Sequence, residues 1–240
     1  MKIRVLSYNT QSGFALGRKV HDHLSQAAHI LSYSPDVVAL QEVAIRHPNG
    51  APINYPAEAA AFLKFNYVFG KALDFGINGE YGVAVMSKFP LREVAKLFLP
   101  VPEKIEPRIA LIVKVLAPEP FYMISTHLSY QGEFPGDDEG RIAQVNCILD
   151  YLDANNLYPA ILAGDLNSAP EDVSIDALRR KFTVFSDRQP IQPTCETSFG
   201  PLQIDFISGS PGENIICHNI EAGCNCTFSD HRAVIADLEF

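Results

Sequence analysis

The chain carries a carboxylate and an amide two residues apart, Asp165 and Asn167, directly after an apolar segment. That segment, Tyr158 to Ala163, is typical of a short buried strand, so the pair stands where a strand gives way to a turn. Residues two apart on an extended chain point to the same side, at a strand end where α/β enzymes usually carry their chemistry. Taken alone, the run Gly-Asp-Leu-Asn suits an ordinary turn better, because Asp and Asn readily bond their own backbone.

Two further acidic positions stand beside strand-like runs near the C-terminus. Asp205 begins an apolar run, and Asp230 directly precedes His231. The alternative interpretations are a charge on an edge strand and a solvated turn, and a single His is more often structural than catalytic.

A stronger pattern lies at the carboxyl ends of the predicted strands. Each of several apolar runs is followed at once by side chains that can do chemistry, and such a set predicts a shared rim where strand ends meet. The runs and their followers are Ile3 to Ser7 with Tyr8 and Asn9, Val37 to Leu40 with Gln41 and Glu42, Phe121 to Ser125 with Thr126 and His127, and Ala160 to Ala163 with Asp165 and Asn167.

Other runs supply the elements that must position this rim. Consecutive strands alternate with stretches of helical periodicity, a mixture that predicts mixed sheets, packed as two layers with helices outside. Further strands are expected at residues 82–87, 110–116, 204–208 and 233–238, and helices at 21–31, 56–63, along the stripe from Ile142 to Leu152, and from Pro170 to Leu178.

Composition bounds the class of protein. The 240 residues are 47% hydrophobic and contain no fixed-period repeat or charge block, so we expect a single domain over residues 1–240. The formal net charge of −9 would repel a polyphosphate at long range, although a cluster of carboxylates holding a divalent cation would reverse this locally.

The N-terminus reads as a strand from Lys2 onward, and the sequence contains no span of about 20 apolar residues. We therefore expect a cytoplasmic protein, the alternative being secretion after removal of a signal peptide. The five cysteines form no CxxC pair, which favours reduced thiols over a disulfide among Cys217, Cys224 and Cys226.

Short polar motifs follow one another in order across residues 7 to 235. They are Tyr8-Asn9, Gln41-Glu42, Glu80-Tyr81-Gly82, Thr126-His127-Leu128, Gly164-Asp165-Leu166-Asn167, Ile204-Asp205-Phe206-Ile207 and Ser229-Asp230-His231. This series resembles the endonuclease/exonuclease/phosphatase superfamily of metal-dependent phosphohydrolases. The resemblance implies a four-layer α/β/β/α sandwich with two packed mixed β-sheets, deoxyribonuclease/sphingomyelinase-like, with a Mg²⁺ or Mn²⁺ site at one edge and hydrolysis of a phosphoester.

The resemblance also implies roles for the metal site and the attacking water. Glu42 is the implied metal ligand, and Asn9 supplies an amide oxygen or orients metal-bound water. Asp230 is a further ligand or a group directly behind the ligands. Asp165 would hold and deprotonate the water, and Asn167 would donate a hydrogen bond to the charge that builds on phosphorus.

The remaining implied roles concern the phosphate. Asp205 would fix the tautomer of His231 and favour its protonated form, which then binds a phosphoryl oxygen. Tyr81 would donate to the phosphate, and His127 would protonate the leaving group or brace the phosphate. Arg108 is expected either to reach the phosphate or to form a surface ion pair.

Some polar residues have simpler expectations. Arg141 and Gln144 are predicted to brace the loop before the third helix, whereas His21, His23 and His29 are predicted to be solvated on a helix face. The acidic loop from Ser129 to Gly140 is expected to border the site and discourage a phosphate backbone, the alternative being a merely solvated loop.

The favoured function is a phosphodiesterase or phosphatase that acts on a small or lipid-derived phosphoester, in a protein expected to be a monomer. A nuclease of the repair or deadenylase type is the first alternative, but the chain lacks the basic, aromatic-interleaved pattern typical of strand binding. A binding module without catalysis is the second, disfavoured because no motif position is lost.

Overall fold

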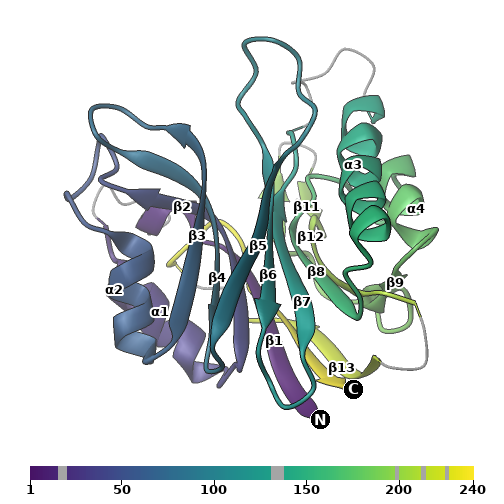
Figure 1. Ribbon diagram of the computed structural model, residues 1–240. Helices are drawn as coiled ribbons and strands as arrows, with labels where there is room; N and C mark the ends of the chain where they lie inside the picture. Colours follow the sequence, from purple (N-terminus) through teal and green to yellow (C-terminus); the bar gives the residue numbers. More distant parts are fainter. Residues whose placement is uncertain (16–20, 131–137, 198–199, 212–214, 225–226) are drawn as a thin grey trace.

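Two six-stranded β-sheets pack face to face, and helices cover the outer face of each sheet (Figure 1). This computed structural model describes residues 1–15, 21–130, 138–197, 200–211, 215–224 and 227–240. The four layers and the mixed strand directions confirm the predicted α/β/β/α sandwich.

The first sheet lies against helices α1 (His23–Ser32) and α2 (Tyr55–Leu63). Its central strands β1 and β2 run parallel, whereas its other pairs are antiparallel. In spatial order the strands are β13 (Ile216–Ala222), β14 (Val234–Glu239), β1 (Lys2–Asn9), β2 (Val37–Ile45), β4 (Glu80–Ser87) and β3 (Asn66–Asp74).

The second sheet lies against helices α3 (Glu139–Asn155) and α4 (Val173–Arg179). Its parallel pair is β7 with β8, and its other pairs are antiparallel. In spatial order the strands are β5 (Leu91–Phe98), β6 (Ile109–Val115), β7 (Phe121–His127), β8 (Ala160–Asp165), β12 (Asp205–Gly209) and β9 (Thr183–Val184). A hairpin of β10 (Cys195–Thr197) and β11 (Gly200–Leu202) stands apart from both sheets, and short 3-10 turns span Gln11–Gly13 and Phe185–Asp187.

Apolar side chains fill all three spaces between the four layers. Val5 and Leu111 pack between the two sheets, Leu6 packs toward α1 and α2, and Ile124 and Leu149 pack between the second sheet and its helices. Successive residues of β1 thus face different layers, and both faces of the strand are buried. This is why the central strands read as continuous apolar runs rather than as alternating ones.

The longer strands missed by the sequence patterns lie at sheet edges. Strands β3, β5 and β13 each have an exposed side, so their sequences mix polar and apolar residues and carry no uniform apolar run. Every strand and helix that the patterns predicted is present, with ends shifted by a few residues.

The histidines near α1 correct one expectation. His21 precedes the helix, and none of His21, His23 and His29 is fully solvated. The His23 Nε2 atom pairs with Glu58 Oε2 at 2.8 Å, and the His29 ring packs against that of Tyr8 at 5.9 Å. Tertiary packing therefore takes up side chains that a helix pattern alone would leave in water.

The described residues bear on two further expectations, the absence of a membrane span and the reduced state of the cysteines. Within them, no helix is both long enough and apolar enough to cross a membrane. Cys147, Cys195, Cys217 and Cys224 are free thiols, in agreement with the reduced state that was favoured, while Cys226 lies outside the described residues.

The two parallel strand pairs create the predicted rim. Asn9 at the end of β1 lies opposite Gln41 of β2, and His127 at the end of β7 lies opposite Asp165 at the end of β8. On the other side of β8, Asp205 also pairs with Asp165. Strand register therefore places one catalytic candidate on each side of Asp165, His127 on β7 and Asp205 on β12.

Gly164 allows the close approach of β8 to β7. A Cβ atom at this position would lie 2.0 Å from the backbone carbonyl oxygen of Thr126, which a packed strand cannot easily move away. We therefore expect Gly164→Ala to lower the free energy of unfolding by about 1–3 kcal/mol, the usual cost of overpacking a core. Urea denaturation followed by circular dichroism measures this, and stability equal to that of the wild type would show that β7 and β8 can separate at little cost.

Candidate active site

A cavity of about 490 Å³ opens at the rim where the strand ends of both sheets meet. Most of the predicted site residues line it. These are Glu42, Tyr81, His127, Asp165, Asn167, Asp230 and His231. The other two, Asn9 and Asp205, are buried behind the wall, and each is hydrogen-bonded to a lining residue.

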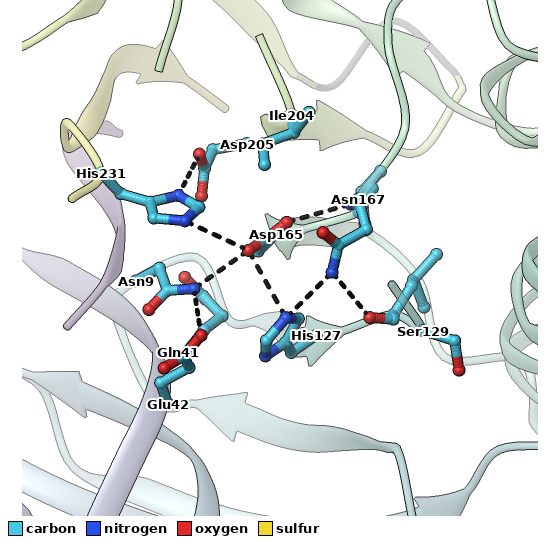
Figure 2. A network of polar contacts seen from close by, with 12 residues as sticks. Asn9, Gln41, Glu42, His127, Ser129, Asp165, Asn167, Ile204, Asp205 and His231 are labelled. Carbon is cyan, nitrogen blue, oxygen red and sulfur yellow. Dashed lines mark hydrogen bonds and ion pairs between the residues drawn. The ribbon is translucent and has the colours of Figure 1, made fainter. Parts of the chain in front are cut away.

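The two carboxylate oxygens of Asp165 have different tasks (Figure 2). Its Oδ1 accepts a hydrogen bond of 2.9 Å from the backbone N–H of Asn167, which is the turn interaction considered for this motif. Its Oδ2 accepts a bond of 3.0 Å from the Asn9 side chain and lies 3.5 Å from His127 Nε2 and 3.7 Å from His231 Nε2. The turn and the chemical interpretation of the motif are therefore compatible.

The environment of Asp165 suits a base that works near neutral pH. The residue is 1% exposed, and its burial, together with the charge of Asp205, raises the pKa of its carboxyl to about 7. Burial disfavours a charged carboxylate, and a second carboxylate nearby disfavours it further. A carboxyl group poised in this way can take a proton from water.

His231 and Asp205 form a buried pair. His231 Nδ1 lies 2.8 Å from Asp205 Oδ2, and the side chains are only 7% and 0% exposed. Burial alone would lower the pKa of His231, but the charge and hydrogen bond of Asp205 outweigh it and raise that pKa well above its usual value. The imidazole therefore carries a positive charge and turns its Nε2 toward Asp165.

Glu42 owes its direction to an irregularity in β2. The pairing of β2 with β4 shifts register between Leu40 and Val43, and Glu42 adopts a left-handed φ of 51°. A bulge of this kind re-aims a side chain out of the strand alternation. Asn9 Nδ2 donates a 3.0 Å hydrogen bond to Glu42 Oε1 as well as one to Asp165, so a single amide ties both carboxylates together.

Asn167 and His127 lie side by side on the second sheet (Figure 2). The Asn167 amide nitrogen donates to the carbonyl of Leu128 and lies 3.0 Å from His127 Nε2. Asn167 has a φ of 49°, a left-handed conformation that Asn adopts more readily than most residues. Burial, followed by the charge of Arg108, lowers the pKa of His127 well below its usual value, so this imidazole is neutral.

Arg108 belongs to the cavity wall rather than to the outer surface. The residue is 6% exposed, its Nη1 lies 3.3 Å from His127 Nδ1, and the same nitrogen pairs with Glu106 Oε1 at 2.8 Å. The expected alternative of a surface ion pair is therefore wrong in its location, because the guanidinium of this pair is buried. Tyr81, at the start of β4, lies on the same side, and burial raises the pKa of its hydroxyl well above 10, so the hydroxyl keeps its proton.

The loop that carries Asp230 and His231 is fastened to β1. Ser229 Oγ donates a 2.7 Å hydrogen bond to the backbone carbonyl of Asn9, and Gln11 Nε2 donates one of 2.9 Å to Asp230 Oδ2. These bonds join residues more than 200 positions apart, which explains how the two ends of the chain contribute to one site.

Several lining residues had no sequence signal that separated them from ordinary surface positions. The hairpin of β10 and β11 brings Cys195, Glu196 and Leu202 to the cavity, and the segment before β6 brings Glu106. The dipeptide Gly200-Pro201 is a general turn or loop signal, and in the structure it begins strand β11 of the hairpin. It does not predict that the hairpin leans over the rim.

The bracing role expected for Gln144 is confirmed. Its Oε1 accepts from the backbone N–H of Ser129, and its Nε2 donates to the Ser129 hydroxyl and to the carbonyl of Pro100.

In the acidic loop, residues 131–137 lie outside the described part of the chain. Asp138 lies within it and accepts from the backbone N–H of Ser174 and from the Arg141 guanidinium.

Two groups of side chains offer donors for a divalent cation. Ligand atoms of Asp165, Asp205 and His231 lie within 4.8 Å of one another, but two of these residues are already bonded to each other through Asp205 Oδ2 and His231 Nδ1. Glu42 and Asp230, which also line the cavity, offer carboxylate oxygens without an internal ion pair of this kind. Hard cations such as Mg²⁺ prefer oxygen ligands, so the donor chemistry of this second group fits such an ion.

Comparisons with known proteins identify the fold and the family. Solved structures with a similar fold include an endonuclease/exonuclease/phosphatase from Beutenbergia cavernae (24% identity, TM-score 0.81, covering 100% of this chain and 72% of that one). They also include a protein of that family from Bacteroides thetaiotaomicron (17%, 0.77, 100% and 98%) and D. rerio TDP2 complexed with single strand DNA product (17%, 0.74, 100% and 99%). A search of the curated proteins found no match. The profile of the Endonuclease/Exonuclease/phosphatase family matches residues 6–231, and the chain therefore belongs to this family, whose members hydrolyse phosphoesters.

Proposed function

We propose that residues 1–240 form one catalytic domain that hydrolyses a phosphodiester or phosphomonoester on a small or lipid-derived molecule, with a divalent cation. One observation carries the proposal. The Oδ2 atom of Asp165 lies in a cavity wall, is buried, and has the imidazoles of His127 and His231 at 3.5 and 3.7 Å. A base thus stands beside imidazoles that can hold the oxygens of the phosphoester, which the activated water attacks.

The residues divide the work according to their protonation. Asp165 takes a proton from the attacking water. His231, which Asp205 keeps cationic, binds a phosphoryl oxygen, and the amide of Asn167 donates to the charge that develops on phosphorus. Tyr81 donates from its place in the lining of the same cavity.

The wall beside Tyr81 holds the phosphate from another direction. Arg108 contributes a buried positive charge, and neutral His127 stands between that guanidinium and Asn167. Of the two roles expected for His127, bracing the phosphate fits this position better than donating a proton.

The oxygen donors nearest this site are the proposed metal ligands. Glu42 and Asp230 would hold Mg²⁺ or Mn²⁺ through their carboxylates, with Asn9 linking Glu42 to Asp165. When bound, such an ion supplies Lewis-acid stabilisation of the charge on the phosphoester. Hydrogen bonds from Asn9 and Gln11 orient the carboxylates of Glu42 and Asp230, whether or not a cation neutralises their charge.

A small phosphoester suits this cavity better than a nucleic acid. The chain has a net charge of −9, and Glu106 and Glu196 line the cavity together with the proposed catalytic residues. Purified protein should be assayed on a bis-aryl phosphodiester, an aryl monoester, single-stranded DNA and abasic duplex DNA, with Mg²⁺ or EDTA. Metal-dependent turnover of the small esters supports the proposal, faster cleavage of DNA would favour a nuclease, and no turnover with any divalent ion would favour a binding module.

The base assignment predicts the effect of a nearly isosteric change. Asp165→Asn should lower kcat by orders of magnitude with the fold intact, because an amide cannot take the proton. Asp176→Asn on the surface of α4, which removes an exposed partner of Arg179, is the matched control and should leave kcat unchanged. An Asp165→Asn activity within about tenfold of the wild type would contradict the role of Asp165 as base.

The metal assignment predicts a change in cation requirement. EDTA should abolish turnover and Mg²⁺ or Mn²⁺ should restore it. Glu42→Gln should raise the Mg²⁺ concentration for half-maximal activity by about tenfold or more, in the range known for weakened metal sites. Glu171→Gln, a change of the same kind at an exposed position, should not alter that concentration. An unchanged Mg²⁺ requirement in Glu42→Gln would remove Glu42 from the ligand set.

The His231 and Asp205 pair predicts a strong energetic coupling. A double-mutant cycle with His231→Gln and Asp205→Asn should give about 1.5–3 kcal/mol for this buried, charge-assisted hydrogen bond. His218 and Glu239 provide the control, since they form the same kind of pair at 2.6 Å with side chains 47% and 36% exposed. Their coupling energy in urea denaturation should be smaller despite the shorter distance, and the reverse order would show that burial does not strengthen the site pair.

A further inference from the structure

A second cavity, of about 220 Å³, adjoins the proposed active site. The two cavities share Glu42, Tyr81 and Glu106, so they meet at these side chains. Asp165 lines only the first. The second cavity therefore lies beside Glu42, outside the cavity that the proposed base lines.

Aromatic rings form a connected series along this second cavity. Phe14 and His47 pack at 4.8 Å between ring centroids, His47 and Phe75 also at 4.8 Å, and Phe75 and Tyr81 at 5.4 Å. All four residues line the cavity and are only partly buried, so part of each ring remains available to a ligand. Aromatic pairs prefer tilted and edge-on contacts of this kind, and a further ring can join them in the same geometry where the cavity has space.

The aromatic wall is supported from behind by His21. The His21 ring packs against Phe14 at 4.1 Å and against His47 at 5.5 Å, and its Nδ1 accepts a 3.0 Å hydrogen bond from the backbone N–H of Ala51. A wall whose rings are already in contact and anchored loses little side-chain entropy when a ligand binds.

The charges of the second cavity oppose a second phosphate group. Among its described lining residues, the charged side chains are the carboxylates of Glu42 and Glu106. His47 adds no positive charge near neutral pH, because burial lowers the pKa of its imidazole. Apart from the cation proposed at Glu42, the described lining of this cavity thus offers no cationic side chain to the next phosphate of a nucleic acid strand.

The second cavity opens beside Glu42 and Tyr81, two residues that also line the proposed active site. A substituent of a phosphoester bound in the first cavity can therefore reach the second one past these side chains.

We propose that the cavity bounded by Phe14, His47, Phe75 and Tyr81 binds an uncharged planar ring carried by the phosphoester. The inference rests on the proposed function and narrows its substrate class. The volume agrees with this ligand, because an apolar cavity of about 150 Å³ is enough to hold a benzene molecule. An aryl alcohol and a nucleoside with no further phosphate share the required ring chemistry.

The test measures binding, so that it does not depend on turnover. Isothermal titration calorimetry with Mg²⁺ would compare the benzyl and cyclohexylmethyl monoesters of methylphosphonic acid, which have similar bulk but differ in planarity. We expect about fivefold tighter binding of the benzyl ester, the size of one favourable ring contact. The 5′-thymidine ester is the third ligand: tighter binding than the benzyl ester would identify a nucleoside as the source of the ring, and weaker binding a simple aryl alcohol.

Two variants and one control locate the preference. Phe75→Leu and His47→Leu should each reduce the benzyl to cyclohexylmethyl ratio toward one, whereas Phe62→Leu, at a position 43% exposed on α2, should leave it unchanged. A ratio near one in the wild type, or a ratio retained in both cavity variants, would overturn the inference.

Hydrolysis of the matching benzyl methyl phosphate diester then separates this inference from the proposed function. If no phosphoester were hydrolysed but the Phe75-dependent preference persisted, the ring pocket would stand and the catalytic proposal would fail. If the diester were hydrolysed without any ring preference, the catalytic proposal would stand and the pocket assignment would fail.

Discussion

The buried carboxylate of Asp165 sets the constraint that the rest of the site must satisfy. An ionised carboxylate with 1% exposure needs hydrogen bonds and nearby positive charge, because water no longer stabilises it. The backbone of Asn167 satisfies one oxygen, while Asn9 and cationic His231 stabilise the other. Burial raises the pKa of Asp165 and the charge of Asp205 raises it further, whereas the imidazole that Asp205 keeps charged lowers it, and together these effects hold the pKa near neutrality. The same balance that stabilises the carboxylate in the wall therefore suits it to the proposed role of a base.

This balance requires both sheets and both ends of the chain. Strands β7, β8 and β12 hold His127, Asp165 and Asp205 in register within one sheet. Asn9 comes from the first sheet, and its amide crosses between Glu42 and Asp165, so the sheets are joined at the site by a polar contact as well as by their apolar core. A site assembled across two packed sheets is rigid, because moving one donor would disturb the packing of a whole layer.

The sequence predicts the central parts of the fold because those parts have both faces buried. Their apolar runs, and the polar residues that follow these runs, can be recognised in the sequence without knowing how the elements pack. Glu42 was identified by its position after a strand, but the bulge and the left-handed φ of 51° that aim its side chain depend on pairing with β4, which is a long-range property. Strands β3, β5 and β13 have mixed polarity because they lie at or near the sheet edges, where part of each strand is exposed to water. The sequence leaves the location of Arg108 open, because a guanidinium can pair with a carboxylate either at the surface or in a cavity wall. Only the tertiary fold distinguishes the two locations.

Local and overall charge act at different ranges in this protein. The net charge of −9 governs the approach of a ligand over distances near the Debye length, about 8 Å at physiological salt, and so disfavours long polyanions. Within the cavity, His231 and Arg108 are buried cations in the lining, where screening by salt is weak. A single phosphoester can therefore be held strongly by a protein that repels a chain of them. The aromatic wall beyond Glu42 agrees with this division, since its described residues offer contact to a ring and no cationic side chain to a second phosphate.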